Sequence, residues 1–204
     1  MPPVVEFHFD FGSPNAYLAH RVIPAIETRT GVAFTYVPIL LGGVFKLTNN
    51  QSPMVQFKGV KNKLEYQRLE VARFLKAHGL TRFAFNPHFP VNTVQIMRGA
   101  IWAERAGALP RYVEAVFVAM WEAGKKLDDP EVIRSTLEAA GLDGGEMLNA
   151  IQEQPIKEAL IKTTEGSVAR GTFGAPTFYV GQDIFFGKDR LREVEAAIVA
   201  VAAR

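Results

Sequence analysis

The chain has 204 residues, which suits one sizeable domain or a small domain carrying a large insertion. Apolar residues make up 48% and charged residues 22% of the sequence, a composition typical of a globular protein. The net charge of +2 and the lack of any run rich in Lys or Arg argue against a nucleic acid as partner. No cysteine is present, which excludes disulfides, thiolate metal sites and a cysteine nucleophile.

The first ten residues have neither the positive start nor the long apolar core of a secretory signal. No apolar run approaches the length of about 18 residues that a membrane span needs. We therefore expect a cytoplasmic protein that does not enter a membrane.

The first forty residues predict a β-α-β unit. Residues 4–11 are rich in β-branched and aromatic side chains that alternate with polar ones, as in a strand. Ser13 stands where a helix N-cap belongs, Pro14 suits the first helical position, and apolar residues at helical spacing continue to Gly31. Residues 32–37 predict a second strand, for which a parallel, right-handed crossover is expected.

The middle of the chain is predicted to be helical. Residues 38–60 contain Gly, Pro and Asn without sustained periodicity, so we expect mostly loop there. Helical patterns run from about residue 62 to residue 170, and Asp129 is expected to cap one helix that Gly141 ends. The intervening stretch FAFNPHFPVNT, residues 83–93, should be extended because of its two X-Pro bonds.

Strands return at the end of the chain. Two short apolar runs flank Gly181-Gln182-Asp183 and predict a hairpin, and residues 191–201 predict a C-terminal helix. The simplest account is one compact α/β unit with an inserted helical subdomain.

Ser13 has two interpretations that local sequence leaves open. It can be a helix cap worth about 1 kcal/mol, or its hydroxyl and the free N–H groups can face an anion at the positive end of the helix. The surrounding GSPNA lacks the G-x-S-x-G pattern of a nucleophile elbow, so a serine hydrolase is weakly supported.

The other local signals are weak. The four histidines lack metal-ligand spacing, so no metal site is expected, and Gly42-Gly43 suits a turn better than a phosphate loop. Asp189 is expected to cap the last helix. In GAPTF, Pro176 follows a Gly-containing turn at the start of a strand, where a cis bond fits, although only about 5–6% of X-Pro bonds are cis.

Four segments together carry a family resemblance: FDFGSPNAYLA, PILLGGVFKLTNNQSP, NPHFPVNTVQIMRGA and GTFGAPTFYVGQDIFFGKDRL. In this order, and over nearly the whole chain, they resemble the 2-hydroxychromene-2-carboxylate isomerases and their relatives, the kappa-class glutathione transferases. The resemblance implies an α/β, thioredoxin-like fold (β-α-β … β-β-α) with a large all-helical insertion, similar to disulfide oxidoreductases that have lost Cys-X-X-Cys. Residues 1–60 and 171–204 would form the thioredoxin-like domain, and residues 61–170 the inserted helical subdomain.

The resemblance also implies a glutathione site. Ser13 matches the active serine that hydrogen-bonds the glutathione sulfur. Ala175 precedes the matching proline, Pro176, so the Ala175–Pro176 bond should be cis and the Ala175 backbone should pair with the cysteinyl unit. The γ-glutamyl end would contact Phe186, Gly187, Lys188 and Asp189.

On the substrate side, the resemblance implies Lys46 as the partner of a carboxylate, together with Asn50, Lys63 and Asn92. Asn49 replaces the family's glycine before Asn50, and about four extra residues precede Lys63, so Lys58 or Lys61 can take its place. These departures fall mainly on the substrate side of the site.

The implied activity is the glutathione-dependent cis-trans isomerisation of 2-hydroxychromene-2-carboxylate to trans-o-hydroxybenzylidenepyruvate, or of a similar intermediate of aromatic-compound catabolism. Glutathione thiolate would add and later be eliminated, so neither a metal nor a redox change is needed. The alternatives are a kappa-like transferase that leaves glutathione on an electrophile, and a non-catalytic thioredoxin-fold binding protein. Family analogy implies a homodimer.

Overall fold

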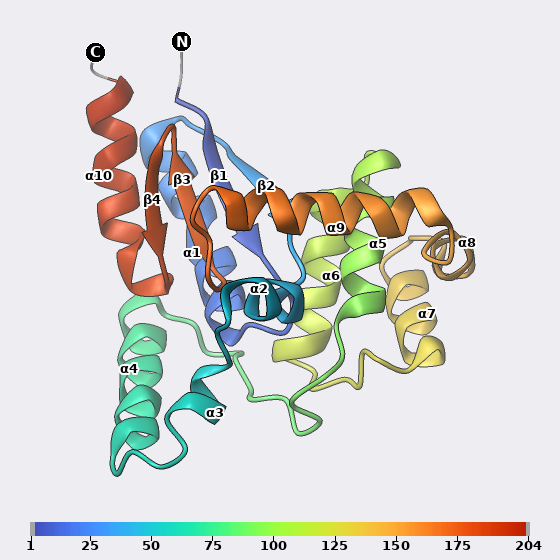
Figure 1. The fold of residues 1–204 in the computed structure, drawn as a ribbon, viewed down its shortest axis with the longest axis horizontal. Coiled ribbons are helices and arrows are strands. Elements are labelled where there is room, and N and C mark those ends of the chain that lie inside the picture. Colours follow the sequence, from blue (N-terminus) through green and yellow to red (C-terminus); the bar gives the residue numbers. More distant parts are fainter. Residues whose placement is uncertain (1–2, 203–204) are drawn as a thin grey trace.

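The computed structural model describes residues 3–202, so residues 1–2 and 203–204 of the predicted thioredoxin-like part lie outside it. Its centre is one four-stranded sheet in the order β2-β1-β3-β4 (Figure 1). β1 (Val5–Phe9) runs parallel to β2 (Phe34–Pro38), and β3 (Thr177–Val180) runs antiparallel to both β1 and β4 (Asp183–Phe186). The predicted β-α-β unit and the hairpin are confirmed.

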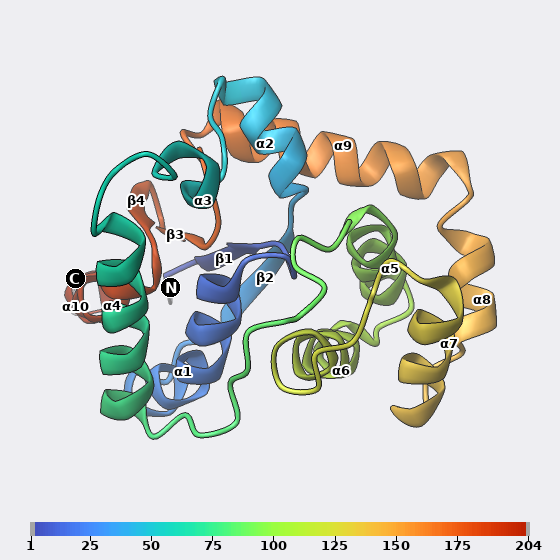
Figure 2. The ribbon, with the colours of Figure 1, turned by 90° about the horizontal axis from the view of Figure 1, so that it is seen from below.

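Helices account for most of the remaining chain. They are α1 Pro14–Thr30, α2 Leu41–Thr48, α3 Pro53–Gln56, α4 Lys63–His78, α5 Val94–Arg105, α6 Leu109–Trp121, α7 Pro130–Ala139, α8 Gly144–Ala150, α9 Gln154–Ala169 and α10 Leu191–Ala202, with a short 3₁₀ helix at Lys188–Arg190. α1 lies on one side of β1 and β2 and α2 and α9 lie on the other, while α5 to α8 form a group beyond β2 (Figure 2). Within residues 3–202, no helix combines the length and hydrophobicity needed to cross a membrane.

The expected helix ends are observed where local chemistry sets them. Ser13 caps α1, and Gly31 ends it with a φ of 70° in the left-handed region that favours glycine. Asp129 caps α7 by accepting from the Glu131 N–H at 3.0 Å. Gly141 follows α7 with a φ of 71°. Residues 83–93, predicted to be extended, contain neither helix nor strand and include a turn at residues 87–88.

The prediction of loop for residues 38–60 was wrong, because α2 and α3 lie there. Gly42-Gly43 belongs to α2 and not to a turn. A Cβ at position 43 would lie only 3.2 Å from Thr164 Cγ2 of α9, so this glycine allows the two helices to approach closely. Its role comes from tertiary packing, which the local sequence does not reveal.

The expected cap at Asp189 was also wrong. Asp189 lies inside the 3₁₀ helix Lys188–Arg190, and Gly187, with a φ of 94°, occupies the cap position. The Asp189 carboxylate is therefore not used to begin α10.

An aromatic cluster joins the sheet to the helical group. Phe9 and Phe11 of the first strand and its following turn are buried against Phe117 of α6, with ring centroids 5.8 Å and 4.8 Å apart. The Trp121 indole N–H donates to the Phe11 carbonyl at 2.8 Å. Apolar burial on this scale anchors the turn between β1 and α1, which carries Ser13.

Candidate functional site

Ser13 is buried between the start of α1 and a turn from the other end of the chain. Its Oγ accepts from the Ala16 N–H at 3.2 Å, as an N-cap does, and donates to the Ala175 carbonyl at 2.9 Å. A serine hydroxyl has one proton, so its donor capacity is fully used by Ala175. Ser13, which the resemblance assigns to the glutathione sulfur, and Ala175, which it assigns to the cysteinyl backbone, are therefore in direct contact.

The turn at Ala175 is built as expected around a cis Ala175–Pro176 bond. Pro176 accepts from the Gly187 N–H at 2.9 Å through its carbonyl, and the next residue, Thr177, pairs with Phe186 in the β3–β4 ladder. The structure thus brings Phe186 and Gly187 next to the proline turn.

The Phe186 ring packs against the residues that precede Ala175. Its ring centroid lies 4.4 Å from that of Phe173, and a Cβ at Gly174 would lie 2.8 Å from Phe186 Cε2, so only glycine fits there. The Asn50 amide donates to the Phe173 carbonyl at 2.9 Å. Asn50, which the resemblance assigned to the substrate side, is therefore bound to the loop that leads to Ala175.

Lys188 and Asp189 play different parts. The Lys188 side chain is 3% exposed, and its ammonium lies 4.8 Å from the centre of the Phe74 ring and bonds to the Asp189 carboxylate. Asp189 is 68% exposed. Asp189 is thus the group that can accept a hydrogen bond from a ligand cation, while the buried Lys188 ammonium pairs with its carboxylate.

Asp10, which no sequence motif singled out, lies at the centre of the turn. It is fully buried and accepts from the N–H groups of Gly12 and Leu41 at 2.8 and 2.7 Å and from the Thr93 hydroxyl at 3.1 Å. Burial raises the pKa of the Asp10 carboxyl, and these three hydrogen bonds oppose the shift. The Asp10 carbonyl also accepts from the Ser13 N–H at 3.0 Å, so Asp10 ties Ser13 to the starts of α2 and α5.

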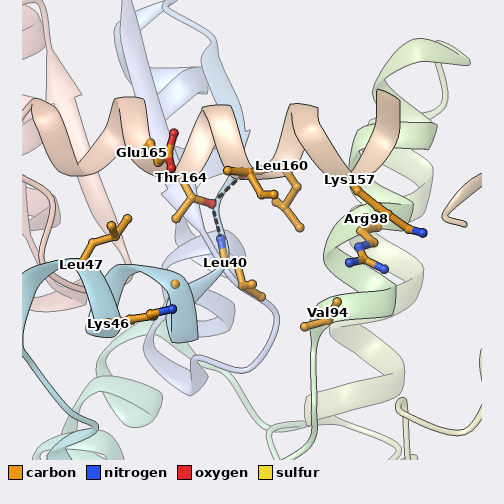
Figure 3. Close-up of a pocket in the computed structure, with 11 residues that line it drawn as sticks. Leu40, Lys46, Leu47, Val94, Arg98, Lys157, Leu160, Thr164 and Glu165 are labelled. Atoms are coloured by element: carbon orange, nitrogen blue, oxygen red, sulfur yellow. Dashed lines mark hydrogen bonds between the residues drawn. The ribbon is translucent and has the colours of Figure 1, made fainter. Parts of the chain in front are cut away.

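Lys46 faces a different space. It lines a cavity of about 270 Å³ between α2, α5 and α9 (Figure 3). The cavity is lined by Leu40, Gly43, Lys46, Leu47, Val94, Arg98, Lys157, Leu160, Ile161, Thr164 and Glu165. Ser13 and Ala175 are not among these residues.

Among residues 3–202, Ser13 forms no hydrogen bond with the remaining residues of the implied substrate side. Lys63 begins α4, with its ammonium 5.1 Å from the centre of the Phe57 ring, and Lys58 and Lys61 line a shallow hollow before α4. Asn92 accepts from the Val94 N–H at 3.1 Å, just before α5.

The fold and this site correspond to a known class. The family model of the DSBA-like thioredoxin domain matches residues 4–199, and the chain belongs to that family. A solved oxidoreductase DsbA from Xylella fastidiosa has the same fold, with a TM-score of 0.62 and 14% identity over 98% of this chain and 86% of that one. Since this chain has no cysteine, it has no thiol of its own for disulfide exchange.

Within that class, the chain is similar to 2-hydroxychromene-2-carboxylate isomerases. It is 26% identical to the enzyme of Pseudomonas putida over 195 residues, covering 96% of this chain and 94% of that one. A solved structure of 2-hydroxychromene-2-carboxylate isomerase superimposes with a TM-score of 0.84, at 26% identity over 98% and 96% of the two chains. The glutathione S-transferase kappa 1 of Rattus norvegicus is 28% identical, over 93% of this chain and 88% of that one.

Proposed function

We propose that the protein is a glutathione-dependent isomerase of 2-hydroxychromene-2-carboxylate or a similar aromatic acid. The observation that carries this proposal is the contact between Ser13 Oγ and the Ala175 carbonyl, at a cis-proline turn of a thioredoxin-like fold that lacks cysteine. Such a site has a hydroxyl and a helix N-terminus where its relatives in the fold have thiols, so it suits a thiolate that comes from a ligand.

Ser13 would stabilise that thiolate by changing hydrogen-bond partner. A free thiol has a pKa near 8.5, and a donor hydroxyl together with the positive end of α1 lowers the pKa of a bound thiol. When the Ser13 hydroxyl turns from the Ala175 carbonyl to the sulfur, that carbonyl is left without its donor. The cysteinyl N–H of glutathione would then donate to it, so that no buried group loses a partner.

The reaction follows from the bound thiolate. The hemiketal ring of the acid first opens as its hydroxyl proton passes to the ring oxygen, which leaves a ketone conjugated to the double bond. The sulfur then forms a C–S bond to the far carbon of that double bond, and the displaced electron pair moves to the ketone oxygen, which gives an enolate. Rotation occurs about the carbon–carbon bond that has become single. The enolate then re-forms the double bond and expels the thiolate, which gives the trans product and returns glutathione without net oxidation or reduction.

The other ligand contacts are part of the same proposal. Asp189 accepts from the α-ammonium of glutathione because its carboxylate is exposed, while Phe186 and Gly187 lie along the peptide. Lys46 meets the carboxylate of the second substrate. Asn92 and one lysine from Lys58, Lys61 and Lys63 would complete the substrate side, and Asn50 joins the two sides through Phe173.

Incubation of the protein with glutathione and 2-hydroxychromene-2-carboxylate tests the activity. The isomerase proposal expects the trans product and full recovery of free thiol. A stable glutathione adduct would instead indicate a kappa-like transferase, which the 28% identity to the rat enzyme supports as the second candidate. Bound but unchanged glutathione and acid would indicate a binding protein and would contradict both enzymes.

The proposal includes a cytoplasmic location and a homodimer. Reduced glutathione is maintained in the cytoplasm, which is where this reaction could draw on it. The homodimer rests only on the likeness to the isomerases and kappa transferases. Cell fractionation and sedimentation velocity test the two statements separately.

A further inference from the structure

The cavity between α2, α5 and α9 carries an excess of positive charge. Lys46 comes from α2, Arg98 from α5 and Lys157 from α9, and Glu165 is the one carboxylate among the lining residues (Figure 3). Arg98 and Lys157 are half-buried, and Lys46 stands at the exposed rim. Three cations around one hollow repel one another unless an anion lies between them.

None of these three cations has an anionic partner within residues 3–202. Other basic side chains of the fold do, such as Arg21, which lies 2.7 Å from Glu114, and Arg29, which lies 2.6 Å from Glu195. Lys46, Arg98 and Lys157 take part in no ion pair or side-chain hydrogen bond among the described residues. Their donors are therefore available to a ligand.

The rest of the cavity wall is apolar. Leu40, Leu47 and Val94 lie on the α2 and α5 sides, and Leu160 and Ile161 lie on α9. The one buried hydroxyl in the wall, that of Thr164, donates to the Leu160 carbonyl at 2.7 Å and accepts from the Leu40 N–H at 3.0 Å, so it is already satisfied. Such a surface suits a flat apolar body, with the charge of the ligand directed at the basic groups.

The inner wall of the cavity adjoins the site of Ser13. Leu40 and Val94 line the cavity and adjoin Leu41 and Thr93 in the chain. The Leu41 N–H and the Thr93 hydroxyl both donate to the buried Asp10 carboxylate. A Cβ at Gly12 would lie 3.0 Å from Thr93 Cγ2, which shows how closely the residue before Ser13 packs there. The cavity therefore lies beside the elements that hold the turn between β1 and α1, which carries Ser13.

We propose that Arg98 and Lys157, together with Lys46, hold the carboxylate of the aromatic acid substrate in this cavity. The planar guanidinium of Arg98 can donate two parallel hydrogen bonds to a carboxylate, and the two ammonium groups add charge from either side. The inference deepens the proposed function and rests on it for the identity of the ligand. It adds two residues that determine which acids the enzyme accepts.

Calorimetric titration of the glutathione-free protein with 2-naphthoate tests this directly. We expect saturable binding, and 2-naphthamide, which has the same rings without the charge, should bind at least about tenfold more weakly. Arg98→Gln and Lys157→Met should each weaken 2-naphthoate binding by about tenfold to a hundredfold. Lys162→Met, which removes an exposed cation of the same helix α9 outside the cavity, should leave it unchanged.

Several outcomes would overturn the inference: no binding of 2-naphthoate, equal binding of the amide, or unchanged affinity in both cavity variants. If Arg98→Gln does not fold, Arg98→Lys keeps the charge and should still weaken binding by losing the paired hydrogen bonds. Failure of the proposed function is a separate result, because it would appear as absent turnover with glutathione while 2-naphthoate binding still depended on Arg98 and Lys157.

Discussion

Replacing Ser13 with alanine should destabilise the protein by more than a helix cap is worth. The change removes the acceptor for the Ala16 N–H, which costs about 1 kcal/mol at an N-cap. It also leaves the Ala175 carbonyl without its donor, and a buried, unsatisfied polar group costs about 1–3 kcal/mol. Because Ala175 keeps 9% exposure, the lower part of that range applies, and we expect a total loss of about 2–3 kcal/mol in the free energy of unfolding.

Urea unfolding followed by circular dichroism measures this loss. Asp129→Ala is the matched control, since Asp129 caps α7 with a single hydrogen bond to Glu131 and should cost about 1 kcal/mol. A loss at position 13 no larger than that of the control would refute the stabilising role of the Ala175 contact. An ultraviolet titration of bound glutathione gives a second readout: without the Ser13 donor, the pKa of the thiol should rise, and an unchanged pKa would show that Ser13 is only a structural group.

Three further predictions concern other parts of the fold. Burial lowers the pKa of His8 from 6.5 to about 4, so between these pH values the unfolded chain binds a proton that the native state does not. The free energy of unfolding should therefore fall by up to about 3 kcal/mol as the pH drops from about 6.5 to 4. Urea melts of His8→Gln should lack this part of the pH dependence. Gly99→Ala should lower the free energy of unfolding by about 1–3 kcal/mol or more, because its Cβ would lie 2.1 Å from the Tyr112 hydroxyl. Gly166→Ala is the control: it lies in α9 with no atom near the added Cβ, so it should raise the free energy of unfolding by about 0.5–1 kcal/mol. Similar melts of both variants would contradict the packing at α5. Asp189→Ala should raise the half-saturating glutathione concentration by about tenfold to a hundredfold in steady-state kinetics and leave that of the aromatic acid nearly unchanged, and an equal shift for both ligands would remove Asp189 from the glutathione side.

Local chemistry was enough to predict most of the scaffold from the sequence. The Ser13-Pro14 helix start, the end of α1 at Gly31 and the hairpin around Gly181 each depend on neighbouring residues, and each is observed. The likeness of four segments to the isomerases then assigned Ser13 and Ala175, 162 residues apart, to one ligand, and the structure places them in direct contact. Periodicity and caps alone contain no information about such a distant contact.

The tertiary structure alone decided the roles that depend on packing between distant segments. Gly42-Gly43 resembles a turn until α9 is placed against Gly43. Asp10 has one local donor, the Gly12 N–H, and acquires the other two only when the starts of α2 and α5 come together beside it. Arg98 and Lys157 look like ordinary surface cations in the sequence. A basic residue on a helix has the same local signature whether it faces water or a cavity, so only the relative placement of three helices reveals that Arg98, Lys157 and Lys46 line one cavity.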